Sequence, residues 1–188
     1  MVDILNKVNH QFRDYRNGFS PESQLAHLDS LTQNFAPSEM ELYTHSDIFL
    51  KLGMESKAIP LLETVVNQLS ATNPRAARVA MSELALAYLR LGEQTNCRAN
   101  HSTESCIIPI QGNGIHKNQT GSRKAIELYE TLLRENPDDM ESRWLLNLAY
   151  MTLGKYPNDV PKAWYIPNIT NTSTTTNAFQ DIAQQLKL

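Results

Sequence analysis

The sequence predicts an all-α protein made of helical hairpins that follow one another along the chain. Apolar residues recur every three or four positions through most of the sequence, which is the period of an amphipathic helix. Three of these stretches end in Leu-Gly, at Gly53, Gly92 and Gly154. A glycine directly after a helix is a common stop signal, so these pairs mark helix ends. The recurrence favours a solenoid of similar units over an irregular helical fold.

The composition is typical of a folded, soluble domain. Of 188 residues, 41% are hydrophobic and 20% are charged. The net charge of -3 gives no support to nucleic-acid binding, which needs a basic stripe. No apolar run approaches the roughly 18 residues that span a bilayer. The N-terminus lacks an apolar signal core, so the chain is either cytoplasmic or exported after a signal was removed before this numbering starts.

The first four helices are predicted from their apolar faces and their end signals. A helix over Val2–Asn17 carries one apolar face and stops at Gly18, and a second starts at Pro21 after Ser20. Residues 1–36 are therefore predicted to form an N-terminal helical pair, either a degenerate repeat or a cap. A third helix runs from Pro37 to Leu52 and a fourth from Ala58 to Leu69.

Residues 37–157 carry spacings that resemble the tetratricopeptide repeat, a helical hairpin of about 34 residues. In that unit a glycine at the turn is followed five positions later by an alanine, as Gly53 is followed by Ala58. The second helix of a later repeat is matched by an alanine, an aromatic residue and a closing proline, at Ala125, Tyr129 and Pro137. First helices are matched by Ala85, Tyr88 and Gly92, and by Trp144, Tyr150, Gly154 and Tyr156. The resemblance implies a tetratricopeptide-like α-solenoid whose small residues let the paired helices approach closely.

An insertion interrupts the second repeat. Gly92 and Ala125 are 33 positions apart where five are expected, an excess of 28 residues. Gly92 and Gly154 are 62 positions apart, which is one repeat of 34 once that excess is removed. We therefore predict a loop over residues 94–121. Loops of this length are uncommon unless they are functional or tied down, and insertions in solenoids often line a binding face.

Both cysteines of the chain lie in this insertion, and three interpretations of them stay open. A Cys97–Cys106 disulfide would close a loop of about 10 residues, contribute about 2–3 kcal/mol and require an oxidising compartment. A metal ion held by Cys97, His101, Cys106 and His116 would have ligand spacings that fit none of the common zinc templates. Otherwise the cysteines are reduced and the histidines lie on the surface. No other cofactor is indicated.

The concave face of such a solenoid is the expected partner-binding groove. Its usual positions are supplied by Tyr43, Asp47, Leu86, Arg90, Trp144 and Met151. The apolar run Ile107–Ile110 cannot be helical across Pro109, and we predict that it folds back and partly fills this groove.

The order of segments is similar to a narrower family. NC…NH…SCIIPI…GIH, then GSRKAIELYETLL, then RWLLNLAYMTLGKYPNDVP, resembles the N-terminal helical region of exported FG-GAP/VCBS-repeat proteins of the ASPIC/UnbV, cartilage acidic protein-like type. In that group the helical region precedes a β-propeller-like domain. The segment AFQDIAQQLKL resembles the first strand of that domain, although Lys187 stands where a glycine is expected. The resemblance covers residues 80–188. It implies an extracellular, periplasmic or cell-surface location, which favours the disulfide. The calcium or partner sites of the propeller cannot be assigned to this chain, because the propeller is absent from it.

Residues 158–188 are predicted to form an extended tail rich in Pro, Ser, Thr and Asn, with its end available as the first strand of a following domain or of a neighbour. Pro157, Pro161 and Pro167 exclude a second helix for the last repeat. The outer face of Met140–Leu153 must then be covered by the segment VPKAWYIPN, by a following domain or by a neighbouring molecule. Four glycosylation sequons, relevant only after export, occur at Asn100, Asn118, Asn168 and Asn171.

No catalytic motif accompanies this architecture: neither a nucleophile elbow nor Walker spacing is found. We therefore predict a non-enzymatic interaction or scaffold module of an exported or cell-surface protein, which binds a protein partner or a neighbouring subunit. Two alternatives stay open. One is a self-assembling structural protein that forms homo-oligomers through its C-terminal tail. The other is a metal-binding module that uses the Cys and His residues of the insertion.

Overall fold

A computed structural model describes residues 1–32, 36–100, 102–167 and 169. Within these ranges the chain is all helical, with no strand, which confirms the predicted class. Seven α-helices and two short 3-10 helices follow one another: α1 (Val2–Phe12), α2 (Pro21–Thr32), α3 (Glu39–Lys51), α4 (Glu55–Thr72), α5 (Pro74–Asn100), η1 (Thr103–Cys106), η2 (Gly112–Gly114), α6 (Thr120–Glu135) and α7 (Met140–Thr152).

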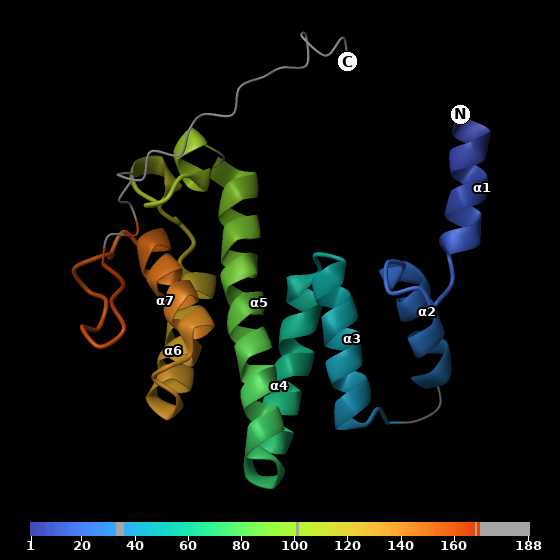
Figure 1. The fold of residues 1–188 in the computed structure, drawn as a ribbon, viewed down its shortest axis with the longest axis horizontal. Helices are drawn as coiled ribbons and strands as arrows, with labels where there is room; N and C mark the ends of the chain where they lie inside the picture. The colour runs from blue at the N-terminus through green and yellow to red at the C-terminus, as the bar shows by residue number, and fades with distance from the viewer. Residues whose placement is uncertain (33–35, 101, 168, 170–188) are drawn as a thin grey trace, which may run out of the picture.

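The helices from α3 to α7 stand side by side in chain order, and each packs against the next (Figure 1). Short turns join α3 to α4 and α6 to α7, at Gly53 and Gly154, and both glycines have φ of +68°. This left-handed conformation strains any residue with a Cβ, which explains why glycine stands at both turns. The predicted stop signals at these two positions are therefore correct.

Side-chain caps start two of these helices. Ser38 precedes α3, and its hydroxyl accepts from the Glu41 amide at 3.3 Å while the Glu41 carboxylate accepts from the Ser38 amide at 2.7 Å. Asp139 precedes α7 and accepts from the Ser142 amide at 3.1 Å. Each cap satisfies amide groups that have no partner within the helix, typically worth about 1 kcal/mol.

Two apolar clusters form the core, and α5 contributes to both. One joins α3, α4 and α5, with Ala58, Leu62 and Val65 fully buried, and the other joins α5, α6 and α7 around Ala125 and Tyr129. The alanines of these clusters are completely inaccessible to solvent. Small side chains at the crossings let the helices approach closely, as the repeat pattern implied.

The predicted loop over residues 94–121 is wrong at its start, because α5 continues as a helix to Asn100. Gly92 is not a stop signal: it is buried within α5, and it is absent from the glycines of positive φ. It lies against Gly121, where an added Cβ would come within 2.8 Å of the Gly92 nitrogen and 2.4 Å of the Tyr88 carbonyl oxygen. The glycine pair therefore serves a close approach of α5 and α6 and not the end of a helix.

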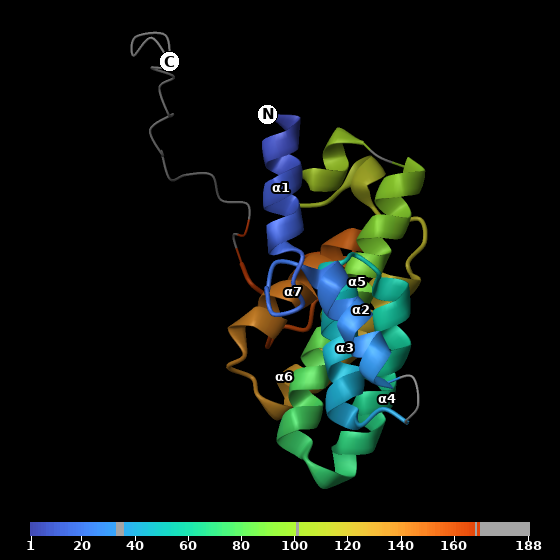
Figure 2. The same ribbon diagram turned by 90° about the vertical axis from the view of Figure 1, so that its right-hand side faces the viewer.

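The N-terminal pair is only partly integrated. α2 packs on α3, and Asp29 contacts His45 at 3.1 Å between Oδ1 and Nε2. α1 extends away from the other helices in both views (Figures 1 and 2). The helix predicted to reach Asn17 ends at Phe12, because the Asn17 side chain donates to the Phe12 carbonyl oxygen at 2.9 Å and turns the chain.

The segment after α7 covers that helix within the same chain, one of the alternatives that the sequence left open. Arg143 of α7 donates to the carbonyl oxygens of Trp164 and Tyr165 at 3.1 and 2.7 Å. The buried amide of Asn147 donates to Trp164 and accepts from the Ile166 amide, at 2.9 and 3.1 Å. The predicted propeller-like strand over residues 178–188 lies outside the described residues.

The glycine contact between α5 and α6 makes a stability prediction. Gly121→Ala places a Cβ against backbone atoms that cannot rotate away, so it should lower the free energy of unfolding by about 1–3 kcal/mol. Urea denaturation measures this. Gly18→Ala is the matched control, because no atom lies within 4 Å of its Cβ position, and it should change stability by less than about 0.5 kcal/mol. Equal stabilities of the two variants would contradict the close approach.

Candidate functional site

The insertion between α5 and α6 is an ordered structure organised by Glu104. The carboxylate of Glu104 accepts from the Asn113 amide at 2.7 Å. The glycines on either side of Asn113 leave room for it, since a Cβ on Gly112 would lie 2.9 Å from the carboxylate and one on Gly114 would lie 2.5 Å from the Glu104 carbonyl oxygen. Gly112 also has φ of +55°. Both glycines are therefore required by the way in which η1 packs on η2.

Hydrogen bonds anchor this insertion to the helices. The amide of His116 donates to the Thr152 carbonyl oxygen at 2.8 Å, and its Nδ1 lies 2.9 Å from the Ser122 hydroxyl. The Thr152 hydroxyl lies 2.8 Å from the same Ser122 oxygen. All three side chains are buried. A polar contact of this kind, fully removed from water, joins the insertion to both α6 and α7.

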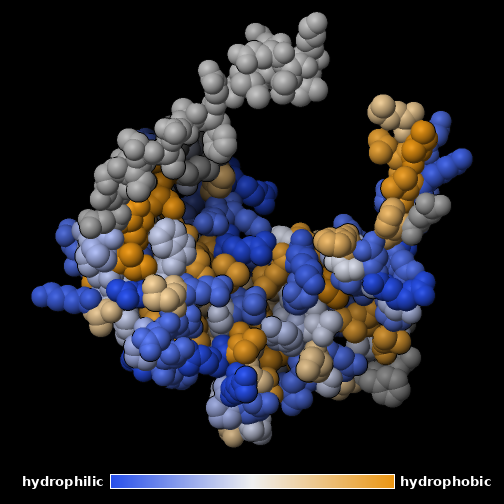
Figure 3. All heavy atoms as spheres, viewed as in Figure 1, coloured by the Kyte–Doolittle hydropathy of each residue, from blue (hydrophilic) through white to orange (hydrophobic). Residues whose placement is uncertain are grey.

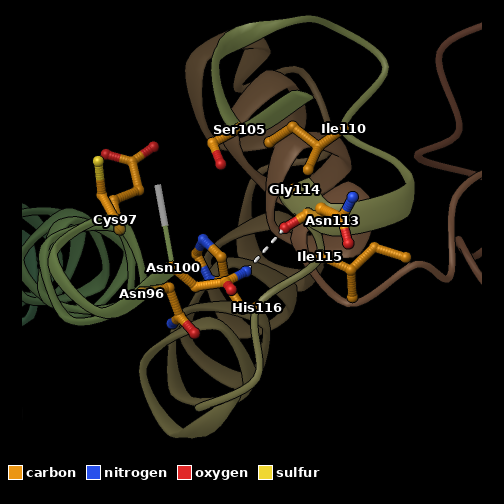
Figure 4. Close-up of a pocket in the computed structure, with 10 residues that line it drawn as sticks. Asn96, Cys97, Asn100, Ser105, Ile110, Asn113, Gly114, Ile115 and His116 are labelled. Atoms are coloured by element: carbon orange, nitrogen blue, oxygen red, sulfur yellow. Dashed lines mark hydrogen bonds between the residues drawn. The ribbon is translucent and has the colours of Figure 1, made fainter. Parts of the chain in front are cut away.

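A second set of hydrogen bonds holds the insertion to α5. The side chain of Asn96 donates to the Asn118 carbonyl oxygen at 2.8 Å and accepts from the Asn118 amide at 2.9 Å. Asn100 donates to the Asn113 carbonyl oxygen at 3.2 Å, drawn as a dashed line in Figure 4. Asn100 also accepts from the Lys117 ammonium at 2.8 Å. The amide side chains of α5 thus supply hydrogen bonds to the backbone of the segment that returns toward α6.

The predicted disulfide is not seen. Cys97 is an exposed free thiol on the last turns of α5, and the side chain of Cys106 lies outside the described part of the structure. The predicted metal site is not tested, because His101 and the side chain of Cys106 lie outside the described part of the chain. Of the other two ligands, both of which line one pocket, His116 lies in hydrogen-bond contact with Ser122. Among the described residues no group of three or more His, Cys, Asp or Glu residues is placed to hold a metal ion.

The prediction that Ile107–Ile110 folds back into the groove is wrong for its first two residues. Ile107 and Ile108 are 59% and 43% exposed. The apolar contact comes instead from Ile115, which packs on Gly154. A Cβ added to Gly154 would lie 2.8 Å from the Ile115 Cδ1. The insertion therefore packs on the turn after α7 through Ile115. Sequence reasoning missed this because Ile115 is isolated among glycines and polar residues.

A pocket of about 290 Å³ opens between the end of α5 and the insertion (Figure 4). It is lined by Glu93, Asn96, Cys97, Asn100, Ser105, Ile110, Asn113, Gly114, Ile115 and His116. Burial lowers the pKa of His116 below its usual 6.5 and so favours the neutral imidazole. Crowding by protein atoms raises the pKa of the Glu93 carboxyl, although the residue still reaches solvent at the pocket mouth.

The residues predicted for the groove come from α3, α5 and α7, and we call the surface that they would form the inner face. Tyr43 and Asp47 of α3 and Leu86 of α5 are half-buried, and Trp144 of α7 is 41% exposed. Met151 is wrong as a groove residue, because it is 1% exposed and belongs to the core.

Arg90 on this face has a structural partner that the sequence did not reveal. Its guanidinium lies 2.8 Å from Oε1 of Glu55, whose side chain is wholly buried at the start of α4, and it donates to the Leu50 carbonyl oxygen at 3.1 Å. The contact with Arg90 is an ion pair without hydrogen-bond geometry, and neither carboxylate oxygen of Glu55 has a hydrogen-bond partner among the described residues. Removal of Arg90 would leave a buried charge unpaired, so this pair is a strong constraint between α4 and α5.

Glu83 is a further inner-face residue that was missed. Burial raises the pKa of its carboxyl, and the neighbouring charges of Asp47 and Glu141 raise it further while Arg90 lowers it. Helical periodicity offered the signal, since Glu83 precedes Leu86 by three positions and Arg90 by seven.

An apolar pocket of about 370 Å³ opens between α3, α4 and α5. Its rim includes Met40 and Val79, which are 72% and 53% exposed, and its wall includes Tyr43. The remaining lining residues are Glu39, Val65, Leu69, Asn73, Ala76 and Ala80.

Comparisons with family models, with curated proteins and with solved structures found no match to this chain. Among the described helices none is long and apolar enough to cross a membrane. The sequons at Asn100 and Asn118 lie in the anchored insertion, and Asn168 and Asn171 lie outside the described residues.

The environment of His116 predicts a pH dependence of stability. The pKa of the His116 imidazole is lower in the folded chain than in the unfolded chain. As the pH falls, the unfolded chain therefore takes up a proton at His116 before the folded chain does. Stability supplied by neutral His116 should be present above pH 6.5 and be lost below it. Urea unfolding at neutral and mildly acidic pH should therefore show a smaller acid-induced loss in His116→Gln than in the natural chain. His10→Gln, on exposed α1, is the control and should leave the pH dependence unchanged. An identical pH profile for both variants and the natural chain would contradict the assignment.

Proposed function

We propose that the chain is a non-enzymatic interaction module that binds an extended segment of a protein partner along the face of α3, α5 and α7. In this proposal the helix pairs form a tetratricopeptide-like solenoid. The proposal is supported by the turns at Gly53 and Gly154, by the buried alanines that follow the repeat spacing and by the packing of each helix on the next. Recognition of a segment in a groove between helices uses apolar anchors and flanking polar contacts.

The observation that carries the proposal is the open apolar pocket between α3, α4 and α5. Its exposed rim residues Met40 and Val79 leave apolar surface in water beside a preformed cavity. Clefts of a few hundred Å³ lined mainly by apolar side chains are the usual form of binding sites. The volume of about 370 Å³ suits one or two apolar side chains of a partner.

The polar residues of the insertion support a structural role over a catalytic one. His116, Ser122 and Thr152 bond to one another and to backbone, and Asn96 is saturated by Asn118 and Gly92. These groups hold the end of α5 against α6 and α7, and so keep the inner face rigid. We further propose, from the resemblance of segment order, that the module belongs to an exported or cell-surface protein.

The groove proposal predicts the effect of a single charge in the apolar pocket. Peptides selected from a random library on the natural chain should bind Val79→Asp at least tenfold more weakly, because the carboxylate would be desolvated by the apolar anchor. Fluorescence anisotropy measures the affinity. Ile107→Asp places the same charge on a similarly exposed isoleucine of the insertion and should bind normally. Peptides that lose affinity only for Ile107→Asp would place the binding face on the insertion.

A second candidate function, self-assembly, is favoured by α1. This helix of 11 residues exposes Leu5, Val8 and Phe12 on one side, at 61%, 42% and 61%, and Figure 3 shows the apolar stripe along it. A helix this short is marginal in water unless its apolar face is packed. The face therefore suits contact with a second copy of the chain. The further contact predicted through the tail would involve its end, and residues 170–188 lie outside the described residues.

Sedimentation velocity over a concentration series tests this candidate. The natural chain should associate as concentration rises, and Leu5→Asp with Phe12→Asp should remain monomeric, because two charges would be buried in an apolar contact. Asn6→Asp with His10→Asp adds the same charge on the opposite side of α1 and should still associate. A monomer at every concentration, or association that the first pair of substitutions leaves intact, would exclude a role for α1.

A further inference from the structure

We infer that the pocket between the end of α5 and the insertion binds a small organic ammonium ion. In this site Nε2 of His116 and the carboxylate of Glu93 accept from the ammonium group, and Ile110 and Ile115 pack against its alkyl chain. The site is separate from the groove proposed above, because its pocket shares no lining residue with the apolar pocket between α3, α4 and α5.

The hydrogen bonds around His116 determine which of its nitrogens carries a proton. Nδ1 lies 2.9 Å from the Ser122 hydroxyl oxygen, which lies 2.8 Å from the Thr152 hydroxyl oxygen. The Thr152 hydroxyl in turn lies 2.8 Å from the Ala149 carbonyl oxygen. Three contacts of this length need three protons, and the two hydroxyls supply only two. The third is the N–H of Nδ1, which donates to Ser122, so that Ser122 donates to Thr152 and Thr152 to Ala149.

The other ring nitrogen of His116 is therefore an open acceptor. Burial lowers the pKa of the imidazole below its usual 6.5, so at neutral pH the ring holds only the proton on Nδ1. Nε2 then carries a free lone pair and has no hydrogen-bond partner among the described residues. His116 is 7% exposed and lines the pocket, where Figure 4 shows its ring. Because a buried acceptor without a donor is costly, this nitrogen favours a ligand that brings N–H or O–H groups.

Glu93 provides a second open acceptor. It lines the same pocket one helical turn before Cys97, and it has neither an ion pair nor a hydrogen bond within the described ranges. The exposed thiol of Cys97 and the side-chain amide of Asn113 also line the pocket. Each of these two groups can donate or accept, so neither of them selects the charge of the ligand.

Other charged groups near this pocket already have partners: Glu104 with the Asn113 amide, Lys117 with Asn100, Arg90 with Glu55, Arg123 with Gln119, and Lys124 with Glu127. Arg98 does not line the pocket. It lies about 140° around α5 from Glu93, because it is five residues further along the helix. Glu93 is therefore the charge that the pocket offers to a ligand.

An ammonium group matches these two acceptors better than a hydroxyl does. It carries three N–H donors and no acceptor, whereas a hydroxyl has one donor. Its positive charge also complements the Glu93 carboxylate, which repels an acid. The half-buried Ile110 and Ile115 add an apolar wall, and the volume of about 290 Å³ is near the lower limit for ligand pockets. The ligand that fits is thus a small alkylammonium ion.

The experiment compares isopentylamine, isopentanol and isovalerate, which share a branched alkyl chain and differ in the polar group. Each is titrated into the isotope-labelled chain at neutral pH, and the affinity is taken from the amide NMR shifts of the residues that line the pocket. The amine, which is protonated at this pH, should bind about tenfold more tightly than the alcohol, and isovalerate should bind most weakly.

Imidazole NMR tests the position of the proton on His116. In the free chain Nδ1 should give the shift of a protonated nitrogen and Nε2 that of an unprotonated one. Addition of the amine should shift Nε2 and leave Nδ1 nearly unchanged, which binding elsewhere on the surface would not do. The loss of these signals in His116→Gln assigns them.

Variants of the chain locate the site. Glu93→Gln should weaken the amine about tenfold and leave the alcohol unchanged, whereas Glu22→Gln on α2 should change neither. Cys97→Tyr fills the pocket from its exposed rim and should abolish the binding of both. Thr95→Tyr, on the opposite side of α5 and also exposed, should bind normally.

A proton on Nε2 in the free chain, or equal affinities of the amine and the alcohol, would overturn the ammonium site. Amine binding that persists in Glu93→Gln and in Cys97→Tyr would also overturn it, because the ligand would lie elsewhere. No binding of any of the three compounds would leave water as the occupant of the pocket and overturn it as well. Val79→Asp should leave the amine unaffected, so these results are independent of the groove.

Discussion

The structure depends on the double packing of α5. This helix lies against α4 on one side and α6 on the other, and it contributes to both apolar clusters. Two helices can approach it closely only where side chains are small, and Ala85, Gly92 and Gly121 meet that requirement. The direction of α5 then determines where the inner face lies and where the insertion can return.

The insertion follows from the same constraint. Because α5 extends beyond α6, the connection must turn back along the exposed last turns, and Asn96 and Asn100 provide the hydrogen bonds that this path lacks. His116 and Ser122 then join the start of α6 to Thr152 at the end of α7 by hydrogen bonds. Hydrogen bonds from neutral side chains, from the Glu104 carboxylate and from the Lys117 ammonium therefore order the insertion.

Ion pairs occupy two of the basic residues on and beside the inner face. Arg90 lies against Glu55, and Lys51 lies against Asp47. The pocket between α3, α4 and α5 exposes apolar surface that the fold does not use. The proposed binding of a partner segment rests on this cavity.

The sequence by itself determined the helical class, the turns at Gly53 and Gly154 and most of the inner face, because helical periodicity and left-handed glycine turns are local properties. It did not determine the role of Gly92, since a glycine that ends a helix and one that admits a neighbouring helix look alike along the chain. Tertiary structure alone decided that α5 continues to Asn100, that His116 bonds to Ser122 and Thr152, and that Arg90 of α5 pairs with Glu55 of α4. Those pairings join residues from separate helices, and their energies exist only after the helices have packed.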